Sequence, residues 1–188
     1  MFDEAVELLG GIDVGINNIG MLGPQGTASL IDMDESKWRD VLEQNLLVTA
    51  LSIKAEAKHM KEIDGGVIIN VSSGETTRPS PFLAGYGAAK AGINHLTETA
   101  AVELGPMGIR VIAIAPGTTL TETVADFFDE ERISAIKQSN PLKRLNDLED
   151  LGYLAVFLAS DFAKNITGQL FLADAGAYLS RERPQSIS

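Results

Sequence analysis

Residues 65–74 read GGVIINVSSG, and this short stretch predicts the architecture of the chain. Its centre is a nearly continuous run of valine and isoleucine between glycines, as expected for a strand that is buried on both faces of a sheet. Three other glycine-bounded apolar runs have the same character: IDVGINNIG (12–20), GIRVIAIAPG (108–117) and GQLFLADAG (168–176). The four runs predict four strands of one sheet.

Stretches with helical periodicity separate these strands. One helix is expected to follow Asp34, a good N-cap residue, and to run from about Trp38 to about Met60. Two more are expected over about 85–104 and 148–159. Strands that alternate with helices favour parallel pairing through right-handed crossovers, which predicts a doubly wound α/β sheet. We expect one domain over residues 1–180, followed by a polar tail at 181–188.

Composition excludes several classes of protein. The chain has 188 residues, about the size of one domain, and its 15 basic and 26 acidic residues give a net charge of −11. A strongly acidic protein repels phosphate backbones and anionic lipid headgroups, so we expect neither a nucleic-acid nor a membrane partner. The absence of cysteine excludes disulfides, thiolate metal sites and cysteine nucleophiles, and we expect no metal. With no signal peptide and no stretch of about 18 apolar residues, we expect a cytoplasmic protein.

Polar and turn residues gather where the predicted strands end, which is where ligands bind in open α/β sheets. The first run ends in NNIG (17–20), the second in Ser72 and Ser73, and the third in Pro116 and Gly117. Asn17 is expected to cross-link strands. Asn18 fits a cofactor contact and a turn about equally well.

Tyr86 and Lys90 form an i,i+4 pair on the helix that follows Ser73. An ammonium near a phenol favours the phenolate, so Lys90 is expected to lower the pKa of Tyr86 and make it a general acid or base. The Ser73 hydroxyl would hold a substrate oxygen as charge develops on it. The alternative is that Tyr86 and Lys90 are only a surface pair.

Asn45 continues the inward stripe of Trp38, Val41 and Leu42, so its amide is expected to be buried with a protein or water partner. A water held by Asn45 and linked to Lys90 would give a proton path to solvent. A purely structural role for this amide is the alternative, and the two roles are compatible.

These motifs resemble, in order and spacing, those of the short-chain dehydrogenase/reductase family: NNIG, the Asn45 helix, VSS, YGAAK, PGTTLT (116–121) and the last strand NITGQLFLADAG. The resemblance implies that Ser73 positions the substrate oxygen, Tyr86 transfers the proton, Lys90 also binds the nicotinamide ribose, and Asn45 holds the relay water. It further implies a set of residues that line the nicotinamide half of an NAD or NADP site: Asn18, Tyr86, Lys90, Pro116, Gly117, Thr119 and Thr121.

The resemblance also implies a homodimer or homotetramer packed through helices at about 36–60 and 84–106. Residues 121–138 are similar to the family's mobile lid over the substrate. Phe127, Phe128 and Ile133 in this segment suggest an apolar substrate, although they would equally well pack under the lid.

The sequence departs from the family at its beginning. The family fold opens with a strand and a glycine-rich turn that holds the pyrophosphate, and a second strand then selects NAD or NADP. No such segment precedes residue 12, and the glycines at 20, 23 and 26 have the wrong spacing. We therefore expect a partial Rossmann-like domain that lacks the first strands, with the 12–18 run as an exposed sheet edge. Ile19 replaces the usual alanine, and Gly15 the usual large aliphatic residue.

Three functions are compatible with these residues. The first is an NAD(P)-dependent oxidoreductase that interconverts a secondary alcohol and a ketone by hydride transfer. The second is a truncated, non-catalytic oligomeric protein that no longer binds the dinucleotide. The third, a hydrolase with Ser73 as nucleophile, is disfavoured because the chain has no G-x-S-x-G elbow and no histidine at a strand end.

Overall fold

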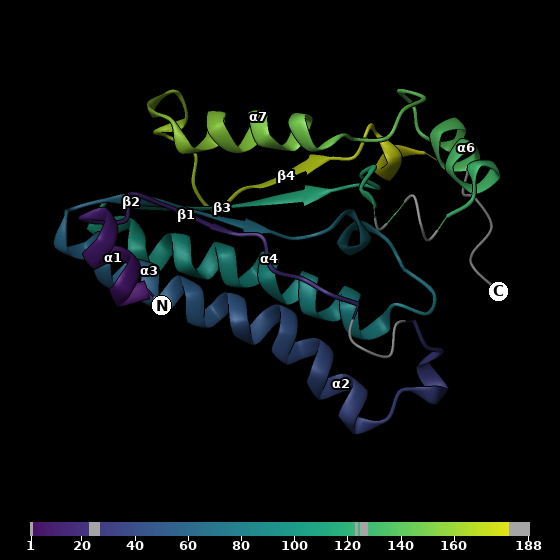
Figure 1. Cartoon of the computed structure of the whole chain (residues 1–188), viewed down its shortest axis with the longest axis horizontal. Coiled ribbons are helices and arrows are strands. Elements are labelled where there is room, and N and C mark those ends of the chain that lie inside the picture. Colours follow the sequence, from purple (N-terminus) through teal and green to yellow (C-terminus); the bar gives the residue numbers. More distant parts are fainter. Residues whose placement is uncertain (1, 23–26, 123, 125–127, 181–188) are drawn as a thin grey trace.

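A computed structural model of the chain describes residues 2–22, 27–122, 124 and 128–180. Four parallel strands form its sheet in the order β1-β2-β3-β4: Val14–Asn17, Gly66–Val71, Ile109–Pro116 and Leu170–Ala173 (Figure 1). Each lies inside one of the four predicted runs, so the parallel α/β sheet is confirmed. The register pairs Asn17 with Asn70 and Pro116 with Ala173, which brings the strand ends to one edge.

Helices cover the two faces of the sheet unequally. On one face lie α3 (Val48–Glu62) and α4 (Ala84–Leu104), and on the other lies α7 (Leu148–Ala159) (Figure 1). The remaining helices are peripheral: α1 (Phe2–Leu9), α2 (Glu35–Leu42) and α6 (Glu130–Ser139). Short 3-10 turns span Leu30–Asp32, Gly74–Thr77, Gly105–Met107, Asp161–Ala163 and Ala177–Leu179.

The helix predicted after Asp34 is one continuous helical segment, which a non-α turn interrupts near its middle. Asp34 caps α2 by accepting a hydrogen bond from the Lys37 backbone at 2.9 Å. A π-helical turn, Glu43–Leu47, then joins α2 to α3. Such turns are frequent at functional sites, and this one contains Asn45.

Apolar side chains bury both faces of the central strands. Ile68 and Val111 pack with Ile53 and Met60 beneath α3 and α4, and Ile69 and its neighbours pack against α7. Because β2 and β3 are covered on both sides, they are continuous in valine and isoleucine. None of the helices in the described part of the chain combines the length and apolarity that a bilayer span requires.

Strand β1 is an edge of this four-stranded sheet, as predicted, and alternates in burial. Val14 and Ile16 are 42% and 53% exposed, whereas Gly15 and Asn17 face α3 and are buried. A Cβ atom at Gly15 would collide with the carboxylate of Glu56 on α3. The glycine that interrupts this strand therefore makes room for a buried acid.

Candidate active site

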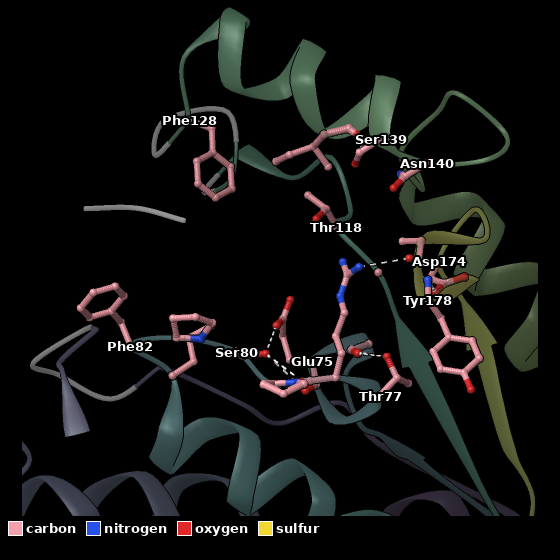
Figure 2. A pocket seen from close by; sticks show the side chains of 18 of the residues that line it. Glu75, Thr77, Ser80, Phe82, Thr118, Phe128, Ser139, Asn140, Asp174 and Tyr178 are labelled. Atoms are coloured by element: carbon pink, nitrogen blue, oxygen red, sulfur yellow. Dashed lines mark hydrogen bonds between the residues drawn. The ribbon is translucent and has the colours of Figure 1, made fainter. Parts of the chain in front are cut away.

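Two adjoining cavities open where the strands end. The smaller, about 200 Å³, brings together six of the predicted site residues: Asn18, Ser73, Tyr86, Lys90, Pro116 and Gly117. The larger, about 430 Å³, shares Gly117 with it and is walled by the loop after Ser73, by α6 and by the segment after β4 (Figure 2). A reacting group in the first cavity would thus be continuous with a larger molecule in the second.

Ser73 and Tyr86 form the centre of the smaller cavity. Ser73 follows β2 in an extended conformation, and its Oγ accepts a hydrogen bond from the Glu75 backbone at 3.2 Å. Tyr86 lies in the first turn of α4 and lines the same cavity as Ser73, whose hydroxyl acts on the Tyr86 phenol. One small molecule can therefore touch both hydroxyl groups.

Lys90, one turn further along α4, is only 2% exposed, and its ammonium is anchored by backbone carbonyls. Its Nζ donates to Ile19 O at 3.0 Å and to Val71 O at 2.9 Å, and it lies 5.8 Å from the centre of the Tyr86 ring. Burial lowers the pKa of Lys90 to about 8. Two of the three ammonium N–H donors are used by the protein, which leaves one for a bound molecule.

The expected lowering of the Tyr86 pKa is wrong. Burial raises the pKa of Tyr86 above its ordinary value, and the nearby Glu75 carboxylate raises it further, against a smaller opposing effect of the Ser73 hydrogen bond. A phenol taken out of water disfavours its charged form, and this outweighs the opposing effect of the Ser73 hydroxyl. Tyr86 is therefore a protonated phenol at neutral pH.

Asn45 is fully buried, as predicted, and its partners are protein atoms. Its Nδ2 donates to Met21 O and Val41 O, both at 2.8 Å, and its Oδ1 accepts from Met21 N at 3.3 Å. Asn45 thus clamps the segment that follows β1, the same segment whose Ile19 carbonyl holds Lys90. A Cβ atom at Gly20 would come within 2.6 Å of Lys90 Nζ, so this segment lies directly against the ammonium.

The predicted cross-link by Asn17 is confirmed. Its Nδ2 donates to Asn70 Oδ1 on β2 and to Glu56 Oε2 on α3, both at 3.0 Å. Asn70 in turn donates to Thr97 Oγ1 at 2.9 Å, so a buried polar chain joins two strands to two helices. Burial raises the pKa of Glu56 to about 7, with the Asn17 hydrogen bond opposing the rise.

The segment after β3 contributes less than predicted. Gly117 lines both cavities, and a side chain there would come within 2.8 Å of the Asp174 backbone, so the close approach requires glycine. Thr119 and Thr121 are not among the residues that line the smaller cavity. Their hydroxyl groups make local bonds instead, to Gly117 O at 3.1 Å and from Val124 N at 3.2 Å.

Sequence reasoning missed several residues of the larger cavity, among them Glu75, Arg78 and Asp174. The signal for Glu75 was its position two residues after Ser73. Phe128 lines this cavity, Ile133 does not, and Phe127 lies outside the described residues. The apolar part of the wall comes instead from Phe82, Leu83 and Ile136 together with Phe128.

Comparisons with known proteins identify relatives of this chain. A family model described as enoyl-(acyl carrier protein) reductase matches residues 1–178. An uncharacterized oxidoreductase of Mycobacterium tuberculosis is 38% identical over 176 residues, which are 94% of this chain and 70% of that protein. A 3-oxoacyl-(acyl-carrier-protein) reductase of Staphylococcus epidermidis is 36% identical over 179 residues, 95% of this chain and 72% of its own.

A solved structure of 7α-hydroxysteroid dehydrogenase, complexed with NADH and 7-oxo glycochenodeoxycholic acid, superposes with a TM-score of 0.87. It is 30% identical, and the match covers 93% of this chain and 67% of that one. The sheet and its flanking helices therefore occur in a solved fold, and the match covers about two thirds of that protein.

Proposed function

The chain belongs to the short-chain dehydrogenase/reductase family, and we propose that it serves an NAD(P)-dependent oxidoreduction between a secondary alcohol and a ketone. The observation that carries this proposal is the meeting of Ser73, Tyr86 and Lys90 in one cavity, which both hydroxyl groups line. The relatives named above support the class, since they are an oxidoreductase, a reductase and a dehydrogenase.

The residues of the smaller cavity fit the nicotinamide half of a dinucleotide. The free N–H of the Lys90 ammonium suits a ribose hydroxyl, and Asn18, Pro116 and Gly117 provide the rest of the wall. We propose NAD or NADP as the cofactor, which when bound accepts or supplies the hydride. Thr119 and Thr121 remain part of this proposal through the turn that they stabilise after Gly117.

The protein's own part in the reaction concerns the proton. In ketone reduction, the Ser73 hydroxyl would donate a hydrogen bond to the carbonyl oxygen, and the Tyr86 phenol would transfer its proton to that oxygen as hydride reaches the carbon. Alcohol oxidation is the reverse and needs the phenolate. Because the pKa of Tyr86 is raised, the oxidation rate should increase with pH above neutrality, and reduction should be favoured at neutral pH.

For Asn45 we propose a combined role. Its clamp on Met21 fixes the segment that carries the Ile19 carbonyl, and so it positions the Lys90 ammonium. The relay water expected between Asn45 and Lys90 would then return protons from solvent to Tyr86. Asn45 does not line the cavity and acts through the segment that holds Lys90. Its loss should therefore disturb the position of the Lys90 ammonium more than the binding of the ketone.

The test compares Tyr86→Phe with Tyr153→Phe on a panel of secondary alcohols and ketones, with both NAD(H) and NADP(H). Loss of the phenolic proton should lower kcat by at least about a hundredfold. Tyr153 lies on α7 with 71% exposure, so its substitution should leave the rate unchanged. Unaltered turnover by Tyr86→Phe would overturn the proposal.

The non-catalytic alternative rests on one observation, that the sheet ends at β1 beside the nicotinamide half of the site. It predicts no NAD(P)H fluorescence change at millimolar cofactor, and saturable binding would remove it. The hydrolase hypothesis finds no support, because no histidine lines the cavity of Ser73: His59 lies against Asp3 and His95 on the surface.

We also propose a cytoplasmic homodimer or homotetramer packed through α3 and α4. Leu47, Leu51 and Val102, from the helices expected to form this contact, are at least half exposed. Light scattering of the purified protein tests it. Leu51→Glu with Val102→Glu should dissociate the oligomer, and an unchanged mass would contradict the proposed contact.

A further inference from the structure

Glu75 occupies a position between the reacting centre and the larger cavity. It belongs to the 3-10 turn Gly74–Thr77, and its backbone N–H holds the Ser73 oxygen that is expected to face the substrate. Its side chain points into the larger cavity, where the Ser80 hydroxyl donates to Glu75 Oε2 (Figure 2). The serine fixes one carboxylate oxygen and leaves Oε1 directed to the cavity side.

The other charged groups of these cavities have protein partners. Lys90 binds the Ile19 and Val71 carbonyls, and Arg78 donates to Ala177 O at 3.1 Å. Asp174 accepts from the backbone of Gly176 and Tyr178, at 2.9 and 2.8 Å. Arg132, on α6, lies over the Phe128 ring at 5.9 Å. The Glu75 carboxylate also lies near enough to Tyr86 to raise the pKa of the phenol.

We propose that Glu75 determines specificity by selecting a ketone that bears a hydroxyl group on the carbon next to the carbonyl, and by excluding a carboxylate at that carbon. The inference rests on the proposed function and names its substrate class as α-hydroxy ketones and the corresponding vicinal diols. A carboxylate is an acceptor only, so Oε1 suits a hydroxyl donor two bonds from the reacting carbon.

The remainder of the cavity suits the same class. Hydroxyl and amide groups of Thr77, Thr118, Ser139 and Asn140 face a cavity of about 430 Å³ that Phe82 and Phe128 close on another side. The Thr77 and Ser139 hydroxyl groups donate to Gly74 O and Ile136 O, so they offer acceptor oxygens to a substrate with several hydroxyl groups. A 2-oxo acid would instead place its negative charge beside the Glu75 carboxylate, which opposes its binding.

The activity test uses Glu75→Gln, which keeps the shape and removes the charge. An α-hydroxy ketone, the simple ketone and the 2-oxo acid of equal chain length are compared by kcat/KM. The 2-oxo acid should gain about tenfold relative to the simple ketone, because the repulsion is removed. Glu75→Ala, which also removes the acceptor, should abolish the preference for the hydroxy ketone. Glu98→Gln, an exposed change on α4, is the matched control and should alter neither ratio.

A second measurement requires no turnover. With Tyr153→Phe and Tyr178→Phe, Tyr86 is the single tyrosine of the chain, so its phenolate can be titrated by ultraviolet absorbance. Glu75→Gln should move the titration midpoint to lower pH, and Glu98→Gln should not. An unmoved midpoint, or unchanged substrate ratios in an active enzyme, would overturn the inference. No turnover of any alcohol or ketone by the parent protein would instead defeat the proposed function, and the titration would still decide whether Glu75 acts on Tyr86.

Discussion

The two ends of the active-site edge differ in how completely they are supported. Around β2 and β3, two of the proposed reactive side chains are held by neighbours: Ser73 accepts a hydrogen bond from the Glu75 backbone, and Lys90 donates to two carbonyls. Around β1, the strand has four residues, and Ile16 is exposed on one face. The residues proposed to transfer the proton therefore lie beside strands with neighbours on both sides, whereas the proposed cofactor side adjoins β1, which pairs with one strand in the described part of the chain.

Lys90 contacts both regions, so its substitution should have the largest effect on activity. Lys90→Met keeps the apolar stem but removes both bonds, to Val71 beside β2 and to Ile19 beyond β1. We expect kcat/KM to fall by about a thousandfold. The proposed proton relay to Tyr86 would lose its ammonium, and the ribose of the proposed cofactor would lose its hydrogen-bond donor. Steady-state kinetics measure this, with Lys54→Met on the outer face of α3 as the control. A loss no larger than that of the control would separate Lys90 from the reaction.

The sequence predicts the local features of this protein better than the contacts between distant segments. The strands β2 and β3 and the pair Tyr86 and Lys90 could be predicted, because continuous apolar runs and i,i+4 spacing are local signals. The direction of the Tyr86 pKa shift could not be predicted, because it depends on the burial of the phenol and on the approach of Glu75, and both arise only on folding. The bonds between Asn45 and Met21 and the match of Gly15 with Glu56 were equally hidden, because both join segments far apart in sequence.

Glu56, which packs against β1, should make the folding stability depend on pH. The pKa of Glu56 is about 7 in the folded protein against an ordinary value of 4.5, so the folded state binds more protons between these values. The contribution to folding stability is present below pH 4.5 and is lost as pH rises toward 7, by about 2 kcal/mol once partial solvent screening is allowed for.

Urea unfolding at pH 5 and pH 8 tests this. The parent protein should lose more stability than Glu56→Gln over that interval, because glutamine keeps the bond to Asn17 without titrating. Glu62→Gln, at the exposed end of α3, should behave like the parent. Equal losses in the parent and Glu56→Gln would show that the buried acid does not titrate in this range.

The smallest expected effect concerns the point where the two regions touch. A Cβ atom at Gly20 would lie 2.6 Å from Lys90 Nζ and 3.1 Å from Asn45 Oδ1, so Gly20→Ala must displace the flexible end of the lysine. The displaced ammonium should cost about tenfold in kcat/KM, with a larger effect on the KM of the cofactor than on that of the ketone. Thermal unfolding should change little, since only a side-chain end moves.

The control for this change is Gly152→Ala on α7, where an added methyl group meets no atom within 4 Å. It should raise the stability of the helix by up to about 1 kcal/mol and leave the kinetics unchanged. If Gly20→Ala instead lost stability while keeping its rate, the segment after β1 would serve the sheet edge rather than the ammonium. The segment after β1 would then contribute to the stability of the sheet edge, and Lys90 would keep its position without it.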